Sequence, residues 1–278
     1  MKHIFLALAL SATVSTAAAT EVPEPIRGIW AWPSCQAPED TLVIYRGYYL
    51  WMDGEQTAFS GVSTQAHPDE PWVQLTEASG YRIFFEPLDN NHLREYYAPN
   101  DAPLGATPQP DWDYHDFESC NGHLPRAHAI LSGETVAFFT AIDPVYGRCD
   151  QDRQSCAQTV FKAIDVSGDA RLSAAELARL IRIALFIAAV SGDEPIEHQE
   201  LAALMAASLP LAPLAARSIV YSFDYDNDGA LSLAELTQDR GSLIDQIEGQ
   251  MSLNFGFNMD SLKDSLGPMG QLLENWRR

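Results

Sequence analysis

Acidic and hydroxyl side chains recur at fixed intervals in two twelve-residue stretches, 165–176 and 224–235. In the second stretch, carboxylates stand at positions 1, 3, 5 and 12, a serine stands at position 9, and a glycine stands at position 6. A loop with this spacing can enclose one calcium ion, which takes about six to eight oxygen ligands. The spacing therefore predicts a calcium site whose ligands are Asp224, Asp226, Asp228, the carbonyl of Ala230, Ser232 and Glu235.

The first stretch departs from this pattern at its turn. Ala170 stands at position 6, where a glycine is expected, and Gly168 comes two places earlier. An L-residue at position 6 must take a conformation that glycine adopts freely, so we expect strain in this loop. It also carries three carboxylates against four, so we expect the second site to bind calcium more tightly. The predicted ligands are Asp165, Ser167, Asp169, the carbonyl of Arg171, Ser173 and Glu176.

With these residues in view, the C-terminal part resembles the EF-hand family, whose helix-loop-helix units normally occur as packed pairs. The resemblance covers about the last 125 residues and rests on the two loops. It implies Ca²⁺ as the cofactor and a short two-stranded bridge between Leu172 and Leu231, which both stand at position 8. Two other interpretations remain open: an acidic, solvated turn for the second loop and a metal-free hand for the first.

Helical patterns flank both loops. A short amphipathic helix over 156–164 is expected to enter the first loop, and a longer one over 173–190 to leave it, ending at Ser191-Gly192. The loops start at 165 and 224, farther apart than a compact EF-hand pair requires, so we expect an additional helix over 195–208 and a new helix from Pro213 into the second loop. One or two amphipathic helices are expected after Glu235. Either the apolar surface of the C-terminal domain receives a protein partner, or these helices cover that surface themselves.

The N-terminal part has the pattern of a small β-domain. Short runs of aromatic and β-branched residues alternate with Gly, Pro, Asn and Asp, so an antiparallel β-barrel or sandwich is expected in 20–148, followed by an α-helical EF-hand pair in 149–278. The fold class is thus α+β with two domains. Gly28-Ile29-Trp30 is similar to the Gly-x-Trp of lipocalins, although a core tryptophan is the simpler interpretation. The expected strands are 27–32, 41–45, 48–52, 72–75, 81–86, 92–97 and 135–142.

Acids and histidines gather in the segment from Asp111 to His128. Such residues could bind a transition metal or supply a general acid and base. Their spacing matches no compact ligand set, so we expect a surface loop tethered by a disulfide.

The N-terminus has the features of a secretory signal. A basic start, an apolar run from Ile4 to Leu10 and the small residues Ala17-Ala18-Ala19 predict a signal peptide over 1–19 and a periplasmic or secreted protein without stable membrane insertion. Four cysteines in an oxidising compartment favour disulfides. Of the three possible connectivities we favour Cys35 with Cys120 and Cys149 with Cys156, while a zinc half-site at the second pair is an alternative.

Composition and motifs narrow the function. The net charge of −21 disfavours nucleic acid as a partner and is consistent with cation binding. No Gly-x-Ser-x-Gly or His-Glu-x-x-His motif occurs, so a hydrolase with structural calcium ranks last and we expect no enzyme. The sequence favours an exported calcium-binding protein in which the ion stabilises the fold or regulates a partner contact. The alternative is a β-barrel that binds a small ligand, with calcium only stabilising the C-terminal domain.

Overall fold

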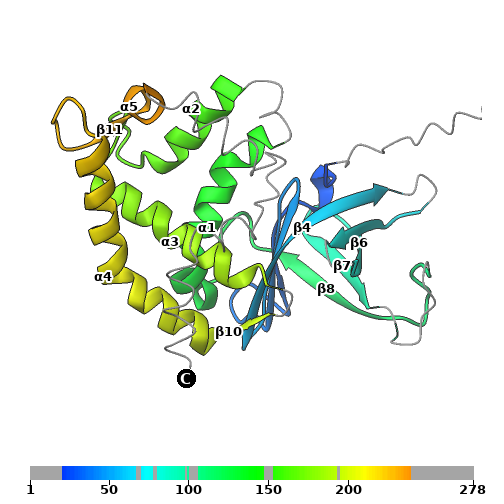
Figure 1. Cartoon of the computed structure of the whole chain (residues 1–278). Helices are drawn as coiled ribbons and strands as arrows, with labels where there is room; N and C mark the ends of the chain where they lie inside the picture. The colour runs from blue at the N-terminus through cyan, green and yellow to red at the C-terminus, as the bar shows by residue number, and fades with distance from the viewer. Residues whose placement is uncertain are drawn as a thin grey trace, which may run out of the picture.

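The chain folds into an eight-stranded antiparallel β-barrel with helices packed along one side (Figure 1). The structure is a computed structural model, and it describes residues 21–66, 70–77, 80–97, 99, 106–146, 153–192 and 195–238. The α+β class predicted from the sequence is confirmed, and the barrel is the arrangement adopted by the β-rich part.

The barrel is an up-and-down meander in which each strand pairs with the next. The circle closes because β1 also pairs with β8, at Trp30↔Ser119 and Ala31↔Glu118. A short strand, β10, adds to the start of β4 at Thr57 and Gln56. The strands are β1 Gly28–Trp32, β2 Asp40–Ile44, β3 Tyr48–Met52, β4 Gln56–Ala66, β5 Val73–Glu77, β6 Arg82–Pro87, β7 His92–Tyr97, β8 Asp113–Ser119 and β10 Ile196–Glu197.

One end of the barrel is closed by the 3-10 helix η1 (Glu24–Ile26). Val22 and Ile26 are fully buried and join the apolar side chains inside the barrel. Trp30 is 3% exposed and its indole N–H donates to the Ile26 carbonyl at 3.0 Å, so it is a core residue, as the sequence favoured. We call the opposite end, where β1 finishes at Trp32 and β2 begins at Asp40, the acidic end.

Three features of the N-terminal part were not predicted correctly. The segment 135–142, expected as a strand, belongs to helix α1 (Arg126–Ile142). Its β-branched and aromatic residues suit a strand in isolation, but as a helix they place Val136, Phe139 and Ile142 in the core beside the barrel. Conversely, β8 occupies part of the acidic segment expected to be a surface loop, and β4 was missed altogether.

The helices that flank the acidic loops follow the prediction except at α4. The two expected helices after Pro195 form one continuous helix, with Pro210 and Pro213 inside it. Proline lacks the N–H for the intrahelical bond, which is why a break was expected. By length and composition α4 could cross a membrane; in this structure it packs along α3. The helices are α2 Arg153–Ile164, α3 Ala174–Val190, α4 His198–Phe223 and α5 Leu233–Gln238, with η2 Asp143–Val145 after α1.

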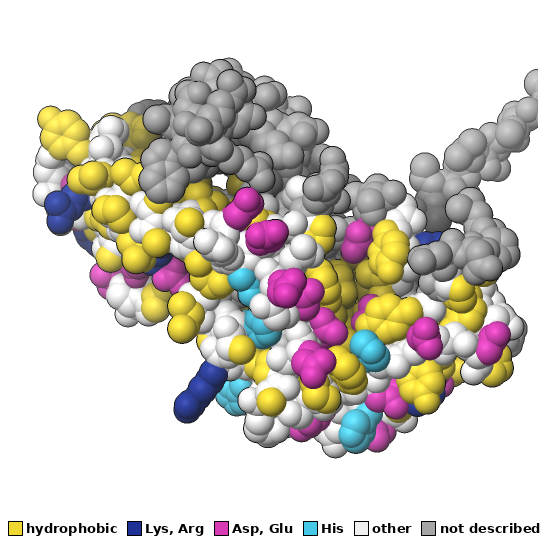
Figure 2. All heavy atoms as spheres, turned by 90° about the horizontal axis from the view of Figure 1, so that it is seen from below, with side chains coloured by type: hydrophobic (Ala, Val, Ile, Leu, Met, Phe, Trp, Pro, Cys, Tyr) yellow, Lys and Arg dark blue, Asp and Glu magenta, His cyan; other side chains and the backbone are white. Residues whose placement is uncertain are grey.

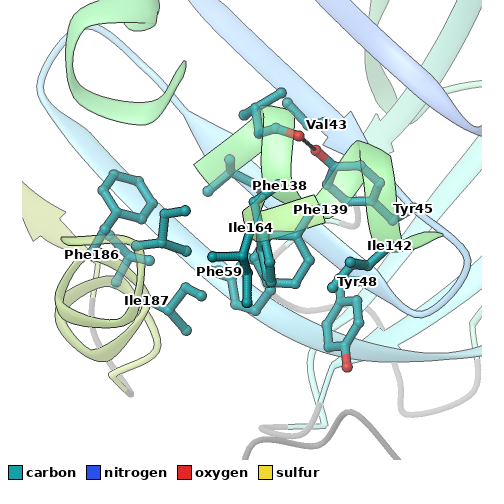
Figure 3. Close-up of a cluster of buried hydrophobic side chains, with 14 of the residues drawn as sticks. Val43, Tyr45, Tyr48, Phe59, Phe138, Phe139, Ile142, Ile164, Phe186 and Ile187 are labelled. Atoms are coloured by element: carbon teal, nitrogen blue, oxygen red, sulfur yellow. Dashed lines mark hydrogen bonds between the residues drawn. The ribbon is translucent and has the colours of Figure 1, made fainter. Parts of the chain in front are cut away.

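An apolar core joins the helices to the outer face of the barrel (Figure 3). Tyr48 and Phe59 from the barrel meet Phe139 of α1, with ring centroids 5.5 and 5.1 Å from Phe139 respectively. The Tyr45 hydroxyl donates to the Val136 carbonyl at 3.0 Å. Barrel and helices therefore share buried surface, which fixes their relative placement.

The predicted Cys35–Cys120 disulfide is present, with the two Cα atoms 5.6 Å apart. It ties the segment after β1 to the end of β8. The predicted pairing of Cys149 with Cys156, the signal peptide over 1–19 and the helices expected beyond residue 238 fall wholly or partly outside the described residues.

Candidate functional site

The second acidic loop, 224–235, lies between α4 and α5 and brings three of its carboxylates together. Oxygens of Asp224, Asp226 and Glu235 all lie within 4.8 Å of one another, and among the described residues no other group of three meets this condition. Oxygens bound to one calcium ion stand about 2.3–2.6 Å from it, so two of them can be at most about 5 Å apart. The spacing of the three carboxylates therefore fits a single ion.

Backbone N–H groups hold these carboxylates in place. Asp224 accepts from Asp228 at 3.0 Å and from Gly229 at 2.8 Å. Glu235 accepts from the N–H and the hydroxyl of Ser232, both at 2.8 Å, and from Tyr225 at 2.9 Å. Gly229 takes a φ of +91°, the left-handed conformation that position 6 requires.

Hydrogen bonding and charge act differently on the two acids at the centre of this loop. The N–H and hydroxyl of Ser232 lower the pKa of Glu235 to about 2, so this carboxylate is ionised at neutral pH. Desolvation and the neighbouring Glu235 carboxylate raise the pKa of Asp226. Like charges held this close repel one another, and a bound cation would relieve the repulsion.

The first acidic loop, 165–176, has nearly the same internal bonding. Asp165 accepts from Asp169 at 3.2 Å and from Ala170 at 2.8 Å, the same two loop positions that donate to Asp224 in the second loop. Glu176 forms a capping box with Ser173 at the start of α3. Burial acts to raise the pKa of Glu176, but the N–H groups of Ser167 and Ser173 outweigh it and lower the pKa. The backbone of this loop is thus arranged like that of the second.

The first loop differs in its turn and in its ligand set. Ala170 takes a φ of +62°, so a β-carbon stands where the chain turns through the left-handed region. Position 3 is Ser167, and the three carboxylates of this loop do not form a group as compact as that of the second, although all its residues are described. The strain predicted from the missing glycine thus has a structural basis, and the second loop has the more compact oxygen set.

The two loops lie side by side. Strand β9 (Arg171–Leu172) pairs with β11 (Leu231–Ser232), so the predicted bridge between Leu172 and Leu231 is present. The Arg171 guanidinium also forms an ion pair with Asp228 across the bridge. Arg171 is a predicted ligand through its carbonyl, and its side chain engages one predicted ligand of the other loop, an arrangement that the sequence did not indicate.

A second concentration of ionisable groups lies at the acidic end of the barrel. The Tyr97 hydroxyl donates to Glu95 at 3.0 Å and lies 3.2 Å from Nδ1 of His115. The His115 ring stacks on Trp32 with centroids 4.0 Å apart, and Asp40 lies 4.0 Å from the same ring nitrogen. Four strands, β1, β2, β7 and β8, contribute these five side chains.

Burial dominates the electrostatics there. Glu95 is 6% exposed, and desolvation raises its pKa to about 8, against the opposing hydrogen bond from Tyr97. Desolvation also raises the pKa of Asp40, which Trp51 contacts by a hydrogen bond. The sequence interpretation did not identify Glu95, Asp40 or Tyr97. The alternation of β7 carries a signal, because Glu95 shares a face with the buried Leu93.

Comparison of the chain with protein-family models, with curated proteins and with solved structures finds no match. The geometry of the two loops and of the barrel interior is therefore the basis for the function proposed below.

Proposed function

We propose that this chain is an exported calcium-binding protein whose two acidic loops act as an EF-hand pair. The observation that carries the proposal is the gathering of Asp224, Asp226 and Glu235 into one oxygen set of the size that a single calcium ion requires. Asp228, Ser232 and the Ala230 carbonyl would complete that set. The first loop would bind more weakly through Asp165, Ser167, Asp169, the Arg171 carbonyl, Ser173 and Glu176.

The role proposed for the ion is structural. When bound, calcium neutralises carboxylates that otherwise repel one another, and it links the end of α4 to the start of α5. Calcium modules outside the cytosol work at Kd values on the order of 10⁻⁴ to 10⁻³ M, and a site of this kind stays filled where calcium is plentiful. Ligand binding to the folded state alone raises its stability.

Two observations support export. The buried Cys120 is paired with Cys35, a bond that persists in oxidising compartments. The apolar run near the N-terminus has the length of a signal peptide rather than of a membrane span. A periplasmic or extracellular location is part of the proposal.

A calcium titration of the mature chain by calorimetry tests the proposal, with the fluorescence of an apolar dye followed in parallel. We expect one tighter and one weaker site, a rise in melting temperature and little change in dye fluorescence. A rise in dye fluorescence would instead favour a calcium-dependent protein contact. If the titration shows no calcium binding up to 10⁻² M, on the order of ten times the weakest expected Kd, the proposal is wrong.

A second function, binding of a small ligand by the barrel, is favoured by the asymmetry of its two ends. The 3-10 helix η1 closes one end with fully buried apolar side chains. The acidic end is instead lined by Trp32, His115 and Tyr97 around two carboxylates. Eight-stranded barrels either are filled by their own side chains or hold one small ligand.

A further inference from the structure

We propose that the acidic end of the barrel binds a small organic cation, a primary amine carried on a flat apolar body, between the Glu95 and Asp40 carboxylates and the surrounding aromatic rings. The inference rests on the second proposed function, ligand binding by the barrel, and does not depend on the calcium loops. In Figure 1 the acidic loops at β11 lie at the side of the helices remote from the barrel.

At this end the exposed fraction of the inward-facing side chains falls from the rim of the barrel toward its interior. The side chains of His115 and Asp40 are 35% and 17% exposed, whereas the deeper Glu95 is 6% exposed and Leu93, beyond it on β7, is fully buried. A ligand that enters from the rim would therefore meet Asp40 and His115 first and Glu95 last. Figure 2 shows one face of the molecule, on which acidic and histidine side chains gather among hydrophobic ones.

The buried carboxylate lacks a permanent cation as its partner among the described residues. The arginine side chains of β6 and β7 lie on the outer face of the barrel. There Arg94 pairs with Asp116 at 2.6 Å, and Arg82 donates to the Ala106 carbonyl at 3.1 Å. The hydrogen bond that Glu95 accepts comes from the neutral Tyr97 hydroxyl. Buried carboxylates are ordinarily paired with a positive charge, and an ammonium group would supply one.

The walls suit the rest of such a ligand. The stacked Trp32 and His115 rings lie parallel, with planes 2° apart, and Trp51 contacts Asp40 from β3. Indole and phenol faces attract cations, and they also pack well against a flat apolar group. Further into the barrel the side chains are apolar, including Leu75, Phe85 and Phe117, all fully buried. This interior limits the ligand to a short body.

The binding of such a cation would depend on pH. The raised pKa of Glu95, about 8, keeps it protonated below neutrality, and an ammonium group requires the ionised form. Affinity for an amine should therefore rise as the pH approaches and passes 8. The titratable groups that interact with Glu95 are Tyr97 on the same strand and Asp40, Tyr49 and Tyr81 on other segments. His115 lies beside Tyr97, and Glu77 interacts with Tyr49 and Tyr81.

The test compares two probes of equal shape, 2-phenylethylamine and 2-phenylethanol, with the full mature chain. Binding is followed at pH 8.5 by calorimetry and by quenching of tryptophan fluorescence. We expect the amine to bind at least about thirtyfold more tightly than the alcohol, and Glu95→Gln to remove that difference while leaving alcohol binding within about twofold. Amine affinity should rise more than about tenfold from pH 6 to pH 8.5 in the unaltered protein and stay flat in the variant.

Asp116→Asn is the matched control, because it removes a carboxylate from the outer face of β8 beside the same strand pair. It should leave both probes unaffected. Equal binding of amine and alcohol would overturn the cation proposal while leaving ligand binding by the barrel in place. A probe concentration of ~10 mM detects binding with a free energy of about 3 kcal/mol or more. If neither probe binds at concentrations up to this level, the cation proposal and the proposal of ligand binding by the barrel both fail.

Discussion

Glu95 and Glu235 are equally inaccessible, each 6% exposed, yet their pKa values move in opposite directions. Three residues of its own loop donate hydrogen bonds to Glu235, and its pKa falls to about 2. Glu95 lies inside the barrel with one neutral hydroxyl as its donor, and its pKa rises to about 8. Desolvation is the largest influence on Glu95, and donated hydrogen bonds are the largest on Glu235, so the balance between the two decides whether a carboxylate stays ionised.

The same comparison separates two kinds of recognition. Hydrogen bonds hold the ionised Glu235 carboxylate of the second acidic loop in place, so a metal ion would meet a charge that is already positioned. The barrel interior holds a neutral acid whose ionisation would have to accompany binding.

The largest effect is expected for Glu235→Gln. The amide cannot give bidentate carboxylate coordination, so calcium affinity of the second loop should fall at least about a hundredfold. Calorimetry on the variant measures this loss, with Glu24→Gln, an exposed change before the barrel, as the control. Two unweakened sites in the Glu235 variant would show that the ligands have been assigned wrongly.

Glu95→Gln should stabilise the protein at neutral pH. Because the pKa in the folded state lies above the unfolded value of 4.5, the stabilising contribution of the proton is fully present below about pH 4.5 and is lost as pH rises toward 8. At pH 7 the unaltered protein has lost about 3 kcal/mol of this contribution, and the variant avoids the loss. Urea unfolding at pH 4 and pH 7 measures the difference; an equal effect at both values would contradict the raised pKa.

Exchanging the turn residues of the two loops tests the strain. Ala170→Gly should stabilise the protein by about 1 kcal/mol, because glycine reaches the positive φ freely. Gly229→Ala should destabilise it by a similar amount through the same conformational cost, since no atom lies within 4 Å of the added β-carbon. Thermal unfolding in a calcium chelator measures both. Shifts of the same sign in the two variants would exclude this explanation.

The smallest effect is expected for Arg171→Gln. The change removes a positive charge beside the second loop and frees Asp228, while the backbone carbonyl at position 7 of the first loop remains. Calcium affinity of the second loop should rise about two- to fivefold, and more at low salt because the interaction is screened. Arg217→Gln, a change on α4, provides the control. A weaker second site would mean that the ion pair supports the loop.

The acidic loops were predictable from sequence because the carboxylates and hydroxyls of each loop lie within twelve consecutive residues and the backbone sets their spacing. A barrel or sandwich was predictable because short runs of aromatic and β-branched residues between turn residues indicate strands, whereas closure into a barrel was left open. The site inside it was not, since Asp40, Glu95 and His115 come from three strands and meet only through the register of the closed sheet. Helix α1 and the unbroken α4 depend on tertiary packing that overrides local preference, as Phe139 and Pro213 show.

Helix α4 also has a mechanical consequence. With 26 residues at about 1.5 Å of rise each, it forms a strut of about 39 Å. Its N-terminal end is attached to the barrel because β10 pairs with β4 and His198 contacts Thr57 at 3.1 Å. Its C-terminal end is followed by Asp224, the first residue of the second acidic loop. Pro210 and Pro213 place its weakest point near the middle, where missing hydrogen bonds lower the resistance to bending. A displacement of the second loop would therefore be transmitted along α4 to the barrel, and α4 would bend most easily near its two prolines.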